Sequence, residues 1–204
     1  MVHLKDAMGA GALSRGQRGF SLTELVVAMA VALILIAVGF PSFMRAYRTY
    51  QLSNAATQLA DILRVCRYDA IRRNAPTACV LKPSTTDPGA TAVWVDTDGN
   101  GVQNGSEKMI LLGDGGNLAD SGSVAGAANL VTQAVGSTGA TAIPPTGATL
   151  TFDARGALNP PGVTVFYLAS PSRPQTGYRG VVMTAAGSIS IWNGDPSGTW
   201  QQAR

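Results

Sequence analysis

Twelve residues in the middle of the chain carry the oxygen ligands expected of a calcium-binding loop. Residues 96–107 place a carboxylate or an amide at loop positions 1, 3, 5 and 9, glycine at position 6 and glutamate at position 12. Calcium loops use this spacing because Ca²⁺ binds six to eight oxygens, and ligands at alternate positions can wrap around the ion. The six candidate ligands are Asp96, Asp98, Asn100, Val102 through its carbonyl, Asn104 and Glu107.

Two interpretations of this loop remain open. Its flanks have the composition of strands, whereas calcium loops of this spacing lie between helices. Asn, Asp and Gly are also the residues that a β-hairpin turn needs for its backbone conformation. The sequence therefore predicts either a Ca²⁺ site or a plain turn between two strands.

Cys66 and Cys79 are the only cysteines, thirteen positions apart. Eight helical residues from Cys66 to Asn74 would span about 12 Å. After a turn at Pro76, a strand rising about 3.3 Å per residue would return toward the helix. The two sulfurs can then meet, and a disulfide closing this loop would contribute about 3 kcal/mol in the chain-entropy model. Two buried free thiols are the alternative.

These side chains follow a segment long and apolar enough to cross a membrane. Residues 20–40 contain a single charged residue, Glu24. At about 1.5 Å per residue, a helix of that length spans the roughly 30 Å hydrocarbon core of a bilayer. The preceding residues are polar and basic, and no small-residue cleavage site follows Phe40, as a secretory signal peptide would require. We therefore expect a membrane-spanning helix.

The helical pattern continues beyond Pro41, which removes one backbone donor and should loosen the helix there. From Leu52 onward the spacing is amphipathic, with most arginines on other faces. We predict one helix from Ser21 to about Arg73, stopped by residues 74–76. Its apolar positions are Leu52, Ala55, Ala56, Leu59, Ile62, Leu63, Cys66 and Ala70.

After Pro76 the sequence changes to short β-prone runs bounded by turn residues. Residues 113–146 are rich in Gly, Ala, Ser and Thr, and we predict a long surface loop there with one weak strand near Leu130 to Val135. A hairpin at residues 185–187 should place Gly187 in the left-handed conformation. The predicted strands are Thr77–Leu81, Ala92–Val95, Lys108–Leu112, Thr149–Phe152, Val163–Leu168, Gly180–Thr184 and Ser188–Trp192. The fold class is therefore α+β, a long N-terminal helix followed by an antiparallel β-sheet domain.

The overall charge gives little support to nucleic-acid binding. The net charge is +3, and only 13% of the 204 residues are charged. The segment before Phe20 supplies three basic residues and one acidic residue, so the remainder carries +1. The C-terminal part is not basic, so a nucleic-acid site would need a local patch of arginines.

The N-terminal residues Gly19-Phe20-Ser-Leu-Thr-Glu24, with the apolar run that follows, closely resemble the processing site of type IV prepilins and type II secretion pseudopilins. Three further motifs, at residues 69–74, 93–96 and 152–156, extend the resemblance to the GspH/FimT family of minor pseudopilins and minor type IV pilins. The resemblance covers most of the chain and is absent across residues 113–146.

The resemblance implies cleavage between Gly19 and Phe20 by a prepilin peptidase, followed by N-methylation of Phe20. It implies that Glu24 pairs with the terminal amine of a neighbouring subunit during filament assembly. A carboxylate at that depth costs about 2.5–3.5 kcal/mol on insertion scales, so it needs such a reason. The alternative is a glutamate that merely favours the first turn of a helix through its macrodipole.

The implied organisation is a pilin-like single-pass protein of the cell inner membrane. Its partners would be the peptidase, membrane lipid, and major and other minor pilins or pseudopilins. The expected parts are a cytoplasmic leader (1–19), a transmembrane and assembly helix (20–41), an amphipathic half-helix (42–74) and a periplasmic β-rich domain (75–204).

Some FimT-like relatives take up DNA through a basic Gly-Arg-x-Arg motif near the last hairpin. The matching residues 187–190 read Gly-Ser-Ile-Ser, so both arginines are missing. Arg155, Arg173 and Arg179 are the remaining candidates for a small basic patch, with solvated positions on strands or loops as the alternative.

No enzyme active site can be assembled from the processed chain. The only histidine, His3, lies in the leader that cleavage would remove, and no Walker loop, dinucleotide fingerprint or zinc cluster is present. We therefore expect a structural subunit of a type II secretion pseudopilus or a type IV pilus tip, without a cofactor other than possible Ca²⁺. The alternatives are a DNA-binding minor pilin and a single-span periplasmic sensor.

Overall fold

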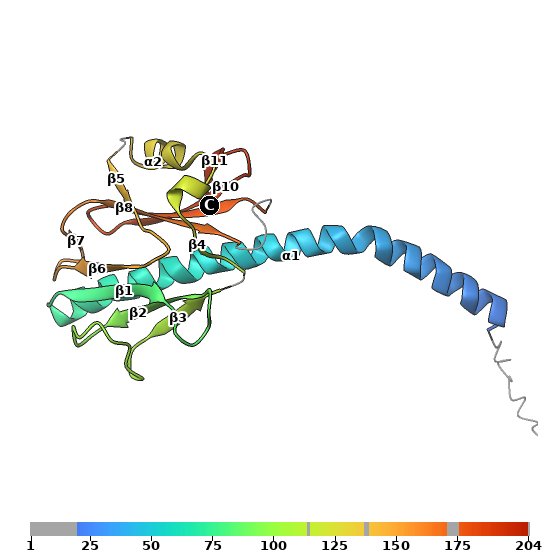
Figure 1. The fold of residues 1–204 in the computed structure, drawn as a ribbon, viewed down its shortest axis with the longest axis horizontal. Helices are drawn as coiled ribbons and strands as arrows, with labels where there is room; N and C mark the ends of the chain where they lie inside the picture. Colours follow the sequence, from blue (N-terminus) through green and yellow to red (C-terminus); the bar gives the residue numbers. More distant parts are fainter. Residues whose placement is uncertain (1–19, 114, 137–138, 171–175, 204) are drawn as a thin grey trace, which may run out of the picture. The chain divides into compact units, whose positions relative to one another are not determined.

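A computed structural model describes residues 20–113, 115–136, 139–170 and 176–203. The described chain divides between Ser42 and Phe43 into two compact units, which are treated separately below. One long helix, α1 (Leu22–Arg73), contributes to both, and the remainder is a β-rich domain with one further α-helix (Figure 1). The predicted α+β class is confirmed, and the predicted first helix differs from α1 by one residue at its start.

The first unit consists of the apolar part of α1. The Leu25 amide donates to the Ser21 carbonyl, 3.1 Å away, and Glu24 lies in the first turn. The helix continues through Pro41. Every side chain from Phe20 to Phe43 is exposed.

The second part of α1 ends where its sequence predicts. Asn74 follows the last helical residue with φ 50°, and the Ala75 amide donates to the Ala70 carbonyl at 3.2 Å. Asn is one of the few residues besides Gly that tolerates this left-handed conformation at a helix C-terminus. Pro76 then prevents the helix from resuming.

Two sheets complete the second unit. The strands of the first sheet lie in the order β3-β2-β1-β6-β7, and those of the second in the order β11-β10-β9-β8-β4, with β5 pairing parallel to β8. The first sheet contains β1 (Thr77–Pro83), β2 (Thr91–Asp96), β3 (Met109–Leu112), β6 (Ala148–Phe152) and β7 (Leu158–Asn159). The second contains β4 (Asn117–Leu118), β5 (Ala140–Ala142), β8 (Val163–Ala169), β9 (Tyr178–Met183), β10 (Ile189–Gly194) and β11 (Trp200–Gln202). All seven predicted strands are present, with ends shifted by one or two residues.

The main core lies between α1 and both sheets. The predicted apolar stripe of α1 is buried there together with Ala60. In β8, Phe166 and Leu168 face this core, whereas Val165 and Tyr167 face a second core on the other side of the sheet. Both faces of β8 are therefore covered, which explains why its sequence is continuously apolar rather than alternating.

The second core corrects the prediction for residues 113–146. The predicted strand at Leu130 to Val135 is wrong, because Ala127–Val135 forms helix α2 on the outer face of the second sheet (Figure 1). Consecutive Leu130 and Val131 are both buried, which one face of a helix permits and strand alternation does not. Leu130 fits because Gly180 lacks a side chain: a Cβ there would lie 2.4 Å from Leu130 Cδ2.

Hydrogen bonds hold this segment to the sheet. Tyr167 donates from its hydroxyl to the Ala127 carbonyl at 2.8 Å, and Trp200 Nε1 donates to the Gly126 carbonyl at 2.9 Å. Burial raises the pKa of Tyr167. The segment also contains the 3₁₀ turn η1 (Ser121–Ser123) and the short strands β4 and β5. It is thus a packed layer rather than a surface loop.

Arg67 joins α1 to two turns from distant parts of the chain. Its Nη1 donates to the Gly187 carbonyl at 2.8 Å, and a Cβ at Gly156 would lie 3.0 Å from Arg67 Nε. Gly187 has φ 76°, as predicted for the hairpin between β9 and β10. A Cβ at Gly187 would lie 2.3 Å from the Gly156 carbonyl oxygen. Because neither glycine has a side chain, the two turns can lie close to each other and to Arg67.

Gly187→Ala should destabilise the domain by about 2–4 kcal/mol, because it combines left-handed strain with a backbone clash. Gly136→Ala is the matched control: Gly136 has φ 71°, and nothing lies within 4 Å of its virtual Cβ. The control should cost only about 1 kcal/mol. Thermal unfolding followed by tryptophan fluorescence measures both, and equal losses would contradict the close approach of the two turns.

Candidate functional site

The start of α1 exposes the residues on which prepilin-like processing and assembly would act. The Phe20 side chain is 82% exposed, and Glu24 is exposed in the first turn. Gly19, the other residue of the predicted cleavage site, lies outside the described residues. Within the described part of the chain, α1 is the one helix long and apolar enough to cross a membrane, judged by length and composition.

This half-helix is apolar on every face. A helix of that kind is stable in lipid or among other apolar helices, not in water. Glu24 is its only charged residue before Arg45. The geometry therefore provides an anchor with one ionisable group near its N-terminal end.

The predicted calcium loop connects β2 to β3. Carboxylate oxygens of Asp96, Asp98 and Glu107 all lie within 4.8 Å of one another, so this cluster can hold a metal ion. Asp96 and Glu107 are buried, and Asp98 is exposed. The remaining predicted ligands, Asn100, Val102 and Asn104, belong to the same loop.

Backbone amides already orient the carboxylates of this loop. Asp96 accepts from the amides of Gly99 and Gly101 at 2.7 and 2.8 Å. Glu107 accepts from the amides of Thr97 and Asn104 at 2.8 and 2.9 Å. These bonds fix the carboxylates of Asp96 and Glu107 against the backbone of the loop.

Two cations that lie outside the loop donate hydrogen bonds to its backbone carbonyls. Arg73 at the end of α1 donates to the Thr97 carbonyl at 3.3 Å, and Lys82 of β1 donates to the Gly101 carbonyl at 2.9 Å. Neither cation forms a salt bridge with Asp96, Asp98 or Glu107 among the residues described. The loop is therefore positioned by α1 and β1, while its carboxylates remain without a paired cation.

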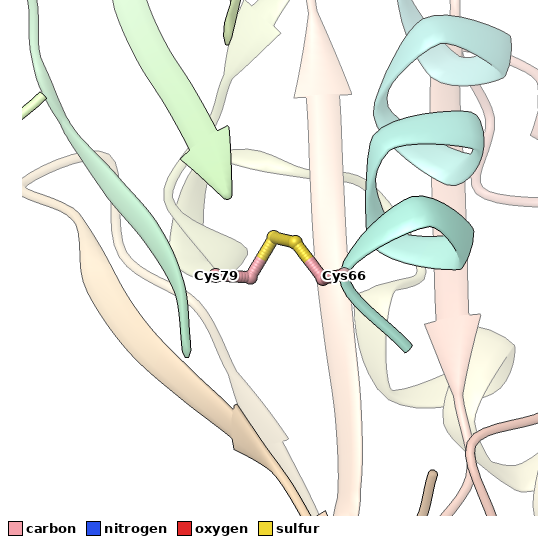
Figure 2. The surroundings of a disulfide bond; sticks show 2 residues. All are labelled: Cys66 and Cys79. Carbon is pink, nitrogen blue, oxygen red and sulfur yellow. A yellow bond between two sulfur atoms is a disulfide. The ribbon is translucent and has the colours of Figure 1, made fainter. Parts of the chain in front are cut away.

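The two cysteines form a disulfide between α1 and β1 (Figure 2). Their Cα atoms are 5.8 Å apart, and both residues are fully buried. The bridge closes a short loop containing the end of α1 and the turn at Pro76. It joins the helix covalently to the central strand of the first sheet.

Two family profiles match the chain. Residues 14–40 match the prokaryotic N-terminal methylation motif, and residues 55–187 match the type II transport protein GspH. The second match covers more than half of the chain. The chain belongs to the GspH family. The methylation motif begins before α1 and ends within it, and the GspH region extends from within α1 to the hairpin before β10.

Two solved structures of the type IV minor pilin FimU from Pseudomonas aeruginosa are similar to this chain. The first has 20% sequence identity and a TM-score of 0.43, covering 74% of this chain and 98% of FimU. The second, from another crystal form, has 18% identity and a TM-score of 0.41, covering 76% of this chain and 95% of FimU. No curated protein gives a significant match.

Membership of the GspH family defines the class of function. The chain is a minor pseudopilin or minor type IV pilin, a structural subunit and not an enzyme. Its prepilin motif implies processing by a prepilin peptidase, and its family implies assembly with other pilins. The apolar half of α1 is consistent with anchoring in the inner membrane before assembly.

Of the three arginines predicted to form a basic patch for nucleic acid, the structure describes Arg155 and Arg179. Arg155 is exposed on the turn between β6 and β7. Arg179 is only 7% exposed, and its guanidinium donates to Ser53 of α1 and to the Tyr178 carbonyl. The assignment of Arg179 to a surface patch is therefore wrong, because the residue faces the helix. Arg173 lies outside the described residues.

The sequence analysis does not predict the hydrogen bonds that Arg67 and Arg179 form within the domain. Arg67 lies four residues after Leu63 and three before Ala70, so its position next to the apolar stripe could have indicated a buried role. Arg179 precedes Val181 and Met183 at alternating positions of β9, which could have placed it on the face toward α1. The sequence analysis instead places most arginines of the helix off its apolar stripe and names Arg179 as a candidate for a basic patch.

Replacing both cysteines, Cys66→Ala with Cys79→Ala, should lower the free energy of unfolding by about 2–4 kcal/mol, because the unfolded chain regains the freedom of the closed loop. Chemical denaturation of the native and double-variant chains measures the difference. In the unreduced native protein, alkylation in denaturant should leave both cysteines unmodified. Alkylation of both without a reductant would show that the bridge is not formed.

Proposed function

We propose that this chain is a minor subunit of a type II secretion pseudopilus or of a type IV pilus tip, where it supports protein secretion or pilus biogenesis. The observation that carries the proposal is the wholly exposed apolar half of α1 with the prepilin motif at its start. The β-rich domain would then contact other minor subunits or a secretion substrate.

In this proposal the chain is divided by processing and by the membrane. Residues 1–19 form the cytoplasmic leader, and cleavage makes Phe20 the N-methylated first residue. Residues 20–41 cross the inner membrane once. The amphipathic residues 42–74 and the domain 75–204 lie in the periplasm, an oxidising compartment that suits the buried disulfide.

Glu24 would act during assembly. After cleavage, the amine of Phe20 is a cation at the end of an apolar helix, four residues from Glu24. Pairing the Glu24 carboxylate with the amine of an adjacent subunit neutralises both charges away from water. The pairing also sets how far one helix slides along the next, because Glu24 is the only carboxylate available in that segment.

Two other functions have less support. A DNA-binding minor pilin would need an exposed basic patch, and Arg179 is buried in this domain. A single-span sensor would keep its leader, so a chain beginning at Met1 in cells with an active prepilin peptidase would favour it.

Glu24→Ala should leave membrane insertion and cleavage intact but reduce incorporation into filaments by about tenfold or more. The reason is that a charge-assisted pair contributes about 1.5–3 kcal/mol. Cross-linking in intact cells, followed by recovery of the other pilin subunits with this chain, measures incorporation.

Thr23→Ala is the matched control, since it alters an exposed neighbour in the same turn without changing charge. Intact-mass measurement should find N-methylated Phe20 at the start of all three proteins. Native incorporation of the Glu24→Ala chain would remove the register role while leaving pilin-type processing in place.

We further propose that the loop between β2 and β3 binds Ca²⁺. The specific observation is the cluster of three carboxylates within 4.8 Å, two of them buried. Like charges so close together repel one another, and a divalent cation compensates them. Asp96, Asp98, Asn100, Asn104 and Glu107 with the Val102 carbonyl supply the hard oxygen ligands that Ca²⁺ prefers.

Millimolar Ca²⁺ should raise the melting temperature of the full chain in detergent by about 2–4 °C, and chelator should reverse the rise. Asp98→Asn should abolish the response, because it removes the exposed carboxylate at nearly constant volume. Asp87→Asn, an exposed change outside the loop, is the control and should respond like the native chain. If neither Ca²⁺ nor chelator changes the melting temperature, the segment is a hairpin turn without a calcium site.

A further inference from the structure

A polar pocket of about 420 Å³ lies between α1 and β10, and no residue of the loop 96–107 lines it. Hydrogen-bonding side chains from four elements line it, and none of its described lining residues is acidic. These side chains are Ser53, Thr57 and Arg64 from α1, Arg179 from β9, Ser190 and Asn193 from β10, and Gln202 from β11.

Arg179 forms the buried wall of this pocket and is 93% buried. Its Nε and Nη2 both donate to the Ser53 hydroxyl, at 3.1 and 3.0 Å, and its Nη1 donates to the Tyr178 carbonyl at 2.8 Å. A guanidinium has five N–H groups. Two of the five therefore have no acceptor within the described part of the protein.

No carboxylate of the described residues lies within salt-bridge distance of Arg179. Two arginines of α1 differ in this respect. Arg64 pairs with Asp61 at 2.7 Å, and Arg72 pairs with Asp69 at 2.6 Å. Desolvation lowers the pKa of Arg179 without any compensating acid, so burial of this charge is costly.

A purely structural role does not account for such an arginine. Arg179 lies in register with Asn193 on the next strand, and Val181 and Met183 of the same strand face the apolar core against α1. An apolar side chain at this position would pack against α1 without the desolvation cost. Instead the strand presents a cation to a pocket lined by hydroxyl and amide groups.

We propose that this pocket binds a carboxylate group, held by the guanidinium of Arg179 and by the hydroxyls and amide around it. Arginine suits a carboxylate because two parallel N–H donors match its two oxygens. Arg64 also lines the pocket, but its charge is paired with Asp61, so Arg179 is the cation available to a ligand. The carboxylate can belong to a small free acid or to an Asp or Glu side chain presented by another protein, and the experiment separates these sources.

The test measures the melting temperature of the full chain in detergent by tryptophan fluorescence. The probes are glutarate, for a free acid, and an Ala-Glu-Ala tripeptide blocked at both ends, for a protein side chain. Sodium chloride at equal ionic strength is the reference. A probe that binds should raise the melting temperature by about 2–5 °C at about ten times its Kd.

Asn193→Asp is the decisive variant. It places a carboxylate directly across the strand pair from Arg179 with almost no change in volume, so the fold should be retained. The variant should melt at a higher temperature than the native chain and lose its response to the probes. Arg155→Gln removes an exposed arginine elsewhere and should keep the native response.

Stabilisation by the tripeptide alone would assign the pocket to an acidic side chain of a partner, and stabilisation by glutarate alone to a small acid. Stabilisation by both would support the site and rank the sources by their Kd. Arg179→Gln, if folded, should respond to neither probe. The proposal is overturned if neither probe stabilises the native chain beyond sodium chloride, or if Asn193→Asp responds as strongly as the native chain.

Discussion

The contact of the amphipathic half of α1 with both sheets is the constraint on which the rest of this domain depends. Leu52, Leu59, Leu63 and Cys66 are fully buried along one stripe, and residues from both sheets pack against it. Burial of apolar area on this scale is the main stabilising term available to a domain of this size. The disulfide from Cys66 to β1 adds a covalent link within that contact.

The second sheet shows how one layer serves two cores. Phe166 faces α1, whereas Tyr167, its neighbour in β8, faces α2 and bonds to the start of that helix. Gly180 in β9 admits Leu130 on one face, and Arg179 beside it opens toward a polar pocket on the other. Of these adjacent residues of one strand, Gly180 packs against α2 and Arg179 lines a polar pocket, because successive side chains point to opposite faces.

The two halves of α1 differ in how their apolar side chains are distributed around the helix. Before Pro41 the helix is apolar all round, and Glu24 is its single carboxylate. After Phe43 the same helix has one buried stripe, and its last turns position the loop that follows β2 through Arg73.

Elements whose signals are local can be predicted from the sequence alone. The long helix, its stop at Asn74, seven strands and the left-handed Gly187 follow from periodicity, hydrophobic runs and turn residues, which act between near neighbours in the chain. The carboxylate cluster from Asp96 to Glu107 was also visible, since all its members lie in one loop. The helix at residues 127–135 is seen only in the tertiary structure, because the space that receives Leu130 is left by Gly180, fifty residues away. The burial of Arg179 against Ser53 is also seen only there, since that contact joins residues 126 positions apart and no local pattern specifies it.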